Sequence, residues 1–206
     1  RFDPASFVGQ EVPVLTRPEF LPIVSSDVLA TLMLKKLPGG IQGFVVEGYT
    51  AGGHNAPPRG KPITFNDEGE PVYGERDVPD FEKLSELGLP FWLAGSYASP
   101  EGLARALSLG AHGIQVGSIF ALCDESGMRP SLRQQIIRMW HRGELRIRKN
   151  ATASPTGFPF MEVQLPGTLS DDEVYKKRRR VCSQHALSTL HRMPDGTIVY
   201  RCPAEI

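Results

Sequence analysis

Short apolar runs alternate with segments of helical periodicity between residues 20 and 127. Nearly every residue of these runs is apolar, which is typical of parallel strands that are covered on both faces. The predicted strands are residues 20–24, 43–47, 90–94 and 113–116. A repeated order of strand, turn and helix indicates parallel βα units. The pattern therefore predicts an α/β fold built on a parallel sheet.

Three helices are predicted between these strands, at residues 28–36, 81–87 and 101–109. Ser or Asp precedes each helix and can accept hydrogen bonds from the free amides of a first turn. One long interruption, residues 55–78, is rich in Pro, Gly and charged residues and follows the second strand. Long loops after the strands of a parallel barrel are where substrate sites are built. We therefore expect the 55–78 loop to lie beside a substrate site.

The pattern changes after residue 127. A helix is predicted at residues 130–142, an extended stretch at 151–167 and a second helix at 171–190. Asp195-Gly196 lies between short apolar segments, which predicts a terminal hairpin. We expect a boundary between a first domain, residues 1–142, and a C-terminal appendage, residues 143–206.

Composition favours a protein that acts on a small molecule. The 23 basic and 23 acidic residues give a formal net charge of zero, so no bulk attraction to nucleic acid or to an anionic membrane is expected. No apolar run approaches the roughly 20 residues that cross a bilayer, and no signal peptide is visible. We expect a cytoplasmic protein. Cys182, His185 and Cys202 are one ligand short of a structural zinc site, so no metal is expected.

The first group of candidate site residues follows the second predicted strand. That strand ends at Glu47, and Gly52, Gly53 and His54 come shortly after it. Two adjacent glycines allow the backbone to approach a bound ligand closely, because neither has a Cβ atom. A histidine can act near neutral pH as a base, an acid or a donor to a developing negative charge. A tight turn with an incidental surface histidine is the alternative.

Two further turns follow the third and fourth predicted strands. The first contains Gly95 and Ser96 and leads into a helix capped by Ser99, and the second is Gln115-Val116-Gly117-Ser118. Barrel enzymes use two successive turns of this kind to hold a phosphate with backbone amides and a helix N-terminus. Together the two turns indicate a phosphorylated ligand, with ordinary barrel turns as the alternative.

Residues 44–128 resemble the nitronate monooxygenase, or 2-nitropropane dioxygenase, family. The resemblance lies in Ala51-Gly52-Gly53-His54, in Ala94-Gly95-Ser96 and in Gln115-Val116-Gly117-Ser118, with a similar helix between the last two. Three positions depart from the usual family residues. Glu47 stands in place of Gln, Ser96 in place of a second Gly, and Ser118 in place of Thr. A carboxylate at Glu47 would disfavour an anionic reduced flavin unless it is neutralised.

The resemblance implies a (β/α)8 TIM barrel that binds FMN without a covalent bond, with His54 as the catalytic residue facing the flavin ring. It implies that Gly52 and Gly53 approach the flavin, beside Glu47. The phosphate and ribityl chain would be held by residues of the two later turns, namely Gly95, Ser96, Gln115, Val116, Gly117 and Ser118.

A complete barrel needs roughly 250 residues, and this chain has 206. We therefore expect the chain to supply the C-terminal half of the barrel plus the appendage, and to associate tightly with an N-terminal half that is an upstream segment or a separate subunit. The expected activity is oxidation of alkyl nitronates or similar carbanions with dioxygen. Two alternatives stay open: an FMN-dependent enoyl-thioester reductase of fatty-acid or polyketide metabolism, and a non-catalytic barrel scaffold.

Overall fold

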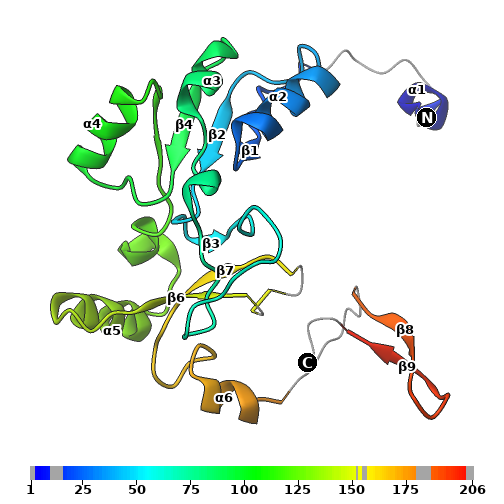
Figure 1. The fold of residues 1–206 in the computed structure, drawn as a ribbon, viewed down its shortest axis with the longest axis vertical. Helices are drawn as coiled ribbons and strands as arrows, with labels where there is room; N and C mark the ends of the chain where they lie inside the picture. Colours follow the sequence, from blue (N-terminus) through cyan, green and yellow to red (C-terminus); the bar gives the residue numbers. More distant parts are fainter. Residues whose placement is uncertain (1–2, 10–15, 152, 155–156, 180–186, 203–206) are drawn as a thin grey trace.

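The computed structural model of the chain describes residues 3–9, 16–151, 153–154, 157–179 and 187–202. Its largest sheet is parallel, with the order β1-β2-β4-β5 (Figure 1). These strands are β1 (Ile23–Val24), β2 (Phe44–Glu47), β4 (Phe91–Ala94) and β5 (Gly113–Gln115). The predicted α/β class and the parallel sheet are confirmed. The first strand begins later than predicted, and one reason is that Pro22 has no amide hydrogen to donate to the ladder.

Three helices follow strands of the parallel sheet: α2 (Asp27–Lys36), α3 (Phe81–Glu86) and α4 (Pro100–Ser108). Each begins where its capping residue predicts. Ser26 accepts from the amide of Leu29, and Ser99 accepts from the amide of Gly102. The predicted helices are therefore confirmed to within a residue or so at each end.

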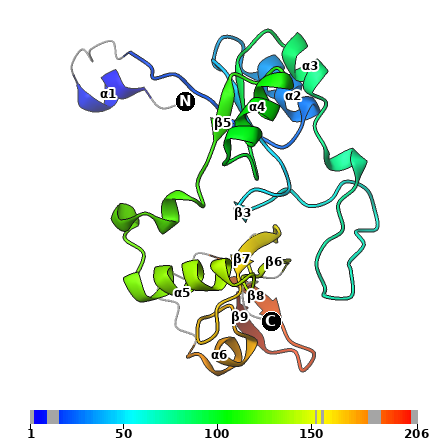
Figure 2. The ribbon, with the colours of Figure 1, turned by 90° about the vertical axis from the view of Figure 1, so that its left-hand side faces the viewer.

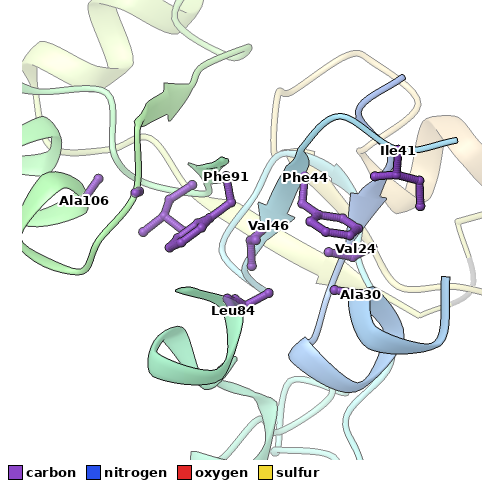
Figure 3. Close-up of a cluster of buried hydrophobic side chains, with 10 residues drawn as sticks. Val24, Ala30, Ile41, Phe44, Val46, Leu84, Phe91 and Ala106 are labelled. Carbon is purple, nitrogen blue, oxygen red and sulfur yellow. The ribbon is translucent and has the colours of Figure 1, made fainter. Parts of the chain in front are cut away.

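The core lies between one face of the parallel sheet and these three helices. Ala30 of α2, Leu84 of α3 and Ala106 of α4 are almost completely buried against the sheet (Figure 3). The strand residues in the same cluster alternate along each strand, as expected when one face of a sheet packs on helices. These residues are Val24, Phe44, Val46, Phe91 and Leu93.

The opposite face of the sheet carries Trp92. A Cβ atom added to Gly113 would lie 3.0 Å from Trp92 Cδ1, and one added to Gly43 would lie 3.1 Å from Trp92 Cζ3. The indole therefore spreads over the strands on both sides of β4, where only glycine leaves enough room. In a closed barrel this face would be the interior.

A second sheet lies at the other end of the molecule and is antiparallel, with the order β3-β7-β6. Its strands are β3 (Gly53–His54), β6 (Ile147–Asn150) and β7 (Phe160–Val163). The parallel sheet and its helices lie above this second sheet in both views (Figure 2). The antiparallel sheet therefore spans the expected boundary at residue 142, since β3 comes from the first part and β6 and β7 come from the appendage. The boundary itself stays a prediction.

The remaining described elements lie outside these two sheets. They are α1 (Pro4–Val8), η1 (Glu75–Asp77), η2 (Phe120–Leu122), η3 (Asp124–Ser126), α5 (Pro130–His141), α6 (Asp172–Lys177), β8 (Thr189–Arg192) and β9 (Ile198–Arg201). The terminal hairpin around Asp195 is confirmed, because β8 and β9 pair antiparallel. None of the helices in the described ranges is long and apolar enough to cross a membrane.

The helix predicted at residues 171–190 is wrong in its length. It ends at Lys177, because Arg178 has an extended backbone with φ −64° and ψ 143°. Residues 189–190 belong to β8 instead, and residues 180–186 lie outside the described part. On a continued helix the basic residues at positions 176 and 180 would be four positions apart on one face, and like charges at this spacing disfavour a helix. Cys182 and His185, weighed above as zinc ligands, also lie outside the described residues.

Candidate functional site

The three turns singled out in the sequence meet at one rim of the parallel sheet. Glu47, Ala94 and Gln115 are the last residues of β2, β4 and β5. In the ladder Glu47 pairs with Ala94, and Ala94 pairs with Gln115. Because parallel strands end at the same edge, the residues that follow each of them are brought side by side.

Two glycines let these turns pack against one another. A Cβ atom at Gly52 would lie 2.6 Å from Ser118 Oγ. One at Gly95 would lie 3.0 Å from both the Ala51 amide nitrogen and Thr50 Oγ1. The first turn therefore contacts the second turn at Gly95 and the third turn at Ser118. The spacing of these residues in the sequence could not by itself establish contacts this close.

The three turns enclose a cavity of about 380 Å³, here called the rim cavity. All nine residues predicted to contact the cofactor line it: Glu47, Gly52, Gly53, Gly95, Ser96, Gln115, Val116, Gly117 and Ser118. The appendage supplies an apolar wall that the sequence did not indicate, formed by Ile147, Met161 and Val163. The sequence indicated that residues 151–167 are extended, but it did not indicate the segment with which they pair.

Ser96 has an unusual backbone within this cavity. Its φ is +61°, and it is the single non-glycine residue with a positive φ in the described part of the chain. Such a conformation costs roughly 1–3 kcal/mol and is concentrated at functional sites. Its neighbour Gly95 also has a positive φ, +106°. The Gly95-Ser96 turn therefore holds a strained shape directly at the cavity wall.

Glu47 is the acidic residue that lines the rim cavity. Burial raises the pKa of its carboxyl group above the ordinary value of 4.5, and the positive charge of His54 acts in the opposite direction. The carboxyl group is therefore protonated over a wider pH range than an exposed glutamate. This shift reduces the negative charge that Glu47 would otherwise place beside a ligand.

The imidazole of His54 does not line the rim cavity. It lies beside a second cavity of about 850 Å³, here called the appendage cavity, together with Arg148, Ser154 and Phe160. His54 Nε2 is 2.6 Å from Ser154 Oγ, and its ring contacts the Phe160 ring edge-on at a centroid distance of 4.9 Å. The structure thus brings together the nine predicted cofactor residues and places the predicted catalytic histidine on the other side of β3.

The 55–78 loop is tied to both halves of the molecule. Tyr73 from this loop stacks on Tyr49 with ring centroids 4.7 Å apart, and Lys149 Nζ lies 4.6 Å from the Tyr73 centroid. Glu70 accepts a hydrogen bond from the Lys149 amide. Burial raises the pKa of Tyr73 to about 12 and lowers the pKa of Lys149. The loop therefore forms a fixed wall between the first turn and β6.

Comparison with known proteins gives one family. The family model described as Nitronate monooxygenase matches residues 20–145. Two relatives named "Probable nitronate monooxygenase" match part of the chain. The one from Staphylococcus haemolyticus (strain JCSC1435) is 30% identical over 99 residues, and the one from Bacillus subtilis (strain 168) is 34% identical over 98. Each match covers 48% of this chain and 26% of the relative. The chain thus aligns with about a quarter of each relative.

Two solved structures are similar to part of this chain. A FabK from Thermotoga maritima has a TM-score of 0.49 and 23% identity, and the match covers 77% of this chain and 43% of FabK. A point mutant of the same FabK has a TM-score of 0.46 and 24% identity, with 76% and 47% covered.

Replacing Glu47 should reveal its raised pKa as a pH dependence of stability. The folded protein keeps the Glu47 proton at pH values where the unfolded chain has lost it. The free energy of unfolding of the wild type, relative to Glu47→Gln, should therefore fall as the pH rises from about 4.5 through the raised pKa, and then become constant. Urea unfolding of both proteins between about pH 4 and pH 7 measures this difference. A difference that does not vary with pH would contradict the assignment.

Gly102→Ala should destabilise the protein although it places alanine in a helix. The exchange ordinarily stabilises a helix by about 1 kcal/mol. Here the new Cβ would lie 2.5 Å from the Tyr97 carbonyl oxygen and 2.9 Å from Tyr97 Cα, so backbone must move. Overpacking of this kind costs about 1–3 kcal/mol, and we expect a net loss of stability in urea unfolding. Gly74→Ala is the control, since nothing lies within 4 Å of a Cβ there.

Proposed function

Because this chain belongs to the nitronate monooxygenase family, we propose that it forms the FMN-binding part of an oxidoreductase that oxidises alkyl nitronates or similar small carbanions with dioxygen. The observation that carries the proposal is the rim cavity. Its walls contain every residue that the family resemblance assigns to the cofactor, drawn from three turns that lie far apart in the sequence.

The rim cavity suits FMN in size and in chemistry. Its volume of about 380 Å³ lies within the roughly 300–1,000 Å³ of cofactor sites. The Ser96 and Ser118 hydroxyls, with the backbone amides of the two later turns, are donors of the kind that hold a phosphate. A Cβ atom at Gly117 would meet nothing within 4 Å, so the backbone there leaves room for a ligand to approach closely. Met161 and Val163 offer an apolar surface for a planar ring.

Bound FMN would accept the electrons removed from the carbanion and pass them to dioxygen, which is redox chemistry that no side chain supplies. The protein's part is binding, orientation and charge. We assign to His54 the removal of an α-proton or the stabilisation of the substrate's negative charge. His54 partly offsets the raised pKa of Glu47, so the imidazole is electrostatically coupled to a group inside the rim cavity even though the ring lies across β3.

In this proposal the role of Glu47 complements that of His54. Since burial raises its pKa, the protonated carboxyl can donate a hydrogen bond without adding a negative charge near the ligand. This property would remove the main objection to a glutamate beside a flavin that becomes anionic on reduction. A carboxyl group with a raised pKa would favour electron transfer into the rim cavity, because it adds less negative charge there.

We also propose that an N-terminal half-barrel completes the sheet, either as an upstream segment or as a separate subunit. Among the described strands, β1 and β5 each have a single neighbour. Apolar side chains are exposed around the β1 edge, with Ile23 55% exposed and Val28 69% exposed. Unpaired strand edges invite pairing with further strands. The interior face around Trp92 would be covered at the same time.

Replacing His54 tests the function. In His54→Ala, nitronate-dependent oxygen uptake should fall by about 10²-fold, at the low end of the range for acid–base groups, because the ring acts from across β3. The flavin absorbance of the purified protein should remain, since His54 does not line the rim cavity. His112→Ala is the matched control, because this exposed histidine lies in the turn between α4 and β5. Unchanged oxygen uptake in His54→Ala would remove the residue from the mechanism.

The same preparation distinguishes the alternatives. Oxidation of NAD(P)H on addition of an enoyl thioester, without oxygen uptake from a nitronate, would point to a reductase instead. A colourless protein with no flavin spectrum would point to a scaffold. Either result would overturn the proposed oxidase activity.

The half-barrel proposal predicts how the isolated 206-residue chain behaves. With its sheet edges and interior face uncovered, it should elute from size-exclusion chromatography as aggregates or as oligomers rather than as a monomer. Light scattering on the eluting peak gives the mass. A well-folded monomer that binds FMN would show that this chain needs no further strands.

A further inference from the structure

His54 is held by two side chains of the appendage. Ser154 Oγ lies 2.6 Å from His54 Nε2, and the Phe160 ring meets the imidazole edge-on, with an interplanar angle of 86°. Ser154 is 100 positions further along the chain and is 7% exposed. Both residues lie beyond residues 20–145, the segment that the family model matches. The surroundings of this histidine are therefore a property of this chain's own appendage.

The pairing of β3 with β7 decides which way the histidine faces. Gly53 pairs with Met161, and His54 pairs with Phe160. Directly paired residues of an antiparallel ladder point to the same face, and successive residues point to opposite faces. Gly53 and Met161 accordingly line the rim cavity, whereas His54 and Phe160 line the appendage cavity. The hairpin thus fixes the side of the strand from which His54 acts.

A serine hydroxyl at this place determines which ring nitrogen is engaged. A neutral imidazole has one donor nitrogen and one acceptor nitrogen, and a hydroxyl can donate to one or accept from the other. The contact with Ser154 therefore engages Nε2 in either tautomer, and it holds the ring in one orientation. An apolar residue of similar size at this buried place would fill the space without that hydrogen bond.

We propose that Ser154 is a positioning residue that fixes the orientation of the His54 imidazole through a hydrogen bond to Nε2. This inference rests on the proposed function for its catalytic consequence, because His54 is there assigned the handling of substrate charge or proton. It also makes the appendage part of the active site. The three turns form the wall of the rim cavity, and the appendage determines the orientation of the histidine.

The test uses the full-length protein labelled with ¹⁵N-histidine. Long-range ¹H–¹⁵N spectra report the protonation of each ring nitrogen, and the His54 signals are those that disappear in His54→Gln. Ser154→Ala should move the His54 nitrogen resonances, whereas Ser154→Thr, which keeps the hydroxyl, should restore them. Ser170→Ala is the matched control: Ser170 lines the same cavity, but its hydroxyl bonds Thr168 and the backbone of Leu165.

Kinetics measure the catalytic consequence. In Ser154→Ala, kcat for nitronate oxidation should fall by about tenfold, within the loss that a misplaced catalytic group can cause, with little change in KM. Ser154→Thr should recover most of kcat, and Ser170→Ala should resemble the wild type. Flavin absorbance confirms that each variant retains the cofactor.

The two proposals fail in different ways. Nitrogen resonances of His54 that are the same in Ser154→Ala and in the wild type would overturn the inference about Ser154, whatever the activity. Moved resonances with an unchanged kcat would also overturn it, since the contact would then be structural alone. A wild-type protein without nitronate-dependent oxygen uptake would count against the proposed function, and the resonances would still decide whether Ser154 fixes the ring.

Discussion

The parallel register of β2, β4 and β5 is the constraint on which the candidate site depends. Glu47, Ala94 and Gln115 are paired in line across three strands, so the chain leaves all three at the same height and on the same rim. The register of the strands therefore brings the turns together, and the turns need no other long-range contact to meet. Gly52 and Gly95 allow the final approach, because a Cβ atom at either would collide with a neighbouring turn. A change of register by one residue would exchange the two faces of a strand and remove the cavity.

A second, antiparallel pairing decides how the site is divided. The strand β3 is two residues long, yet it joins the turn after β2 to the hairpin of β6 and β7. Because successive residues point to opposite faces, Gly53 lies on the side of the rim cavity and His54 on the side of the appendage cavity. The appendage is thus coupled to the site by backbone pairing, by the Ser154 hydroxyl and by the Lys149 contact with the tyrosine stack.

Electrostatics connect the two cavities that geometry separates. Burial favours the protonated form of Glu47, while the charge of His54 favours the ionised form, and burial is the larger effect. The result is a rim cavity with a reduced negative charge and an imidazole beyond its wall. Such surroundings suit a ligand that carries a phosphate and becomes more negative during reaction.

The βα repeat and the helix starts follow from the amino-acid sequence, because they depend on local rules: apolar runs form buried strands, and Ser or Asp caps a helix. The nine residues of the rim cavity were identified by the glycine-rich turns together with the family resemblance. Three facts required the three-dimensional structure: His54 faces away from the other nine residues, Ser154 holds it, and Met161 and Val163 close the wall. Those facts depend on which distant segment pairs with β3, and two residues of strand carry too little pattern to specify a partner. The helix predicted beyond Lys177 was wrong for a related reason. Thr189 and Leu190 pair with β9, and a local helical pattern contains no information about pairing with a later strand.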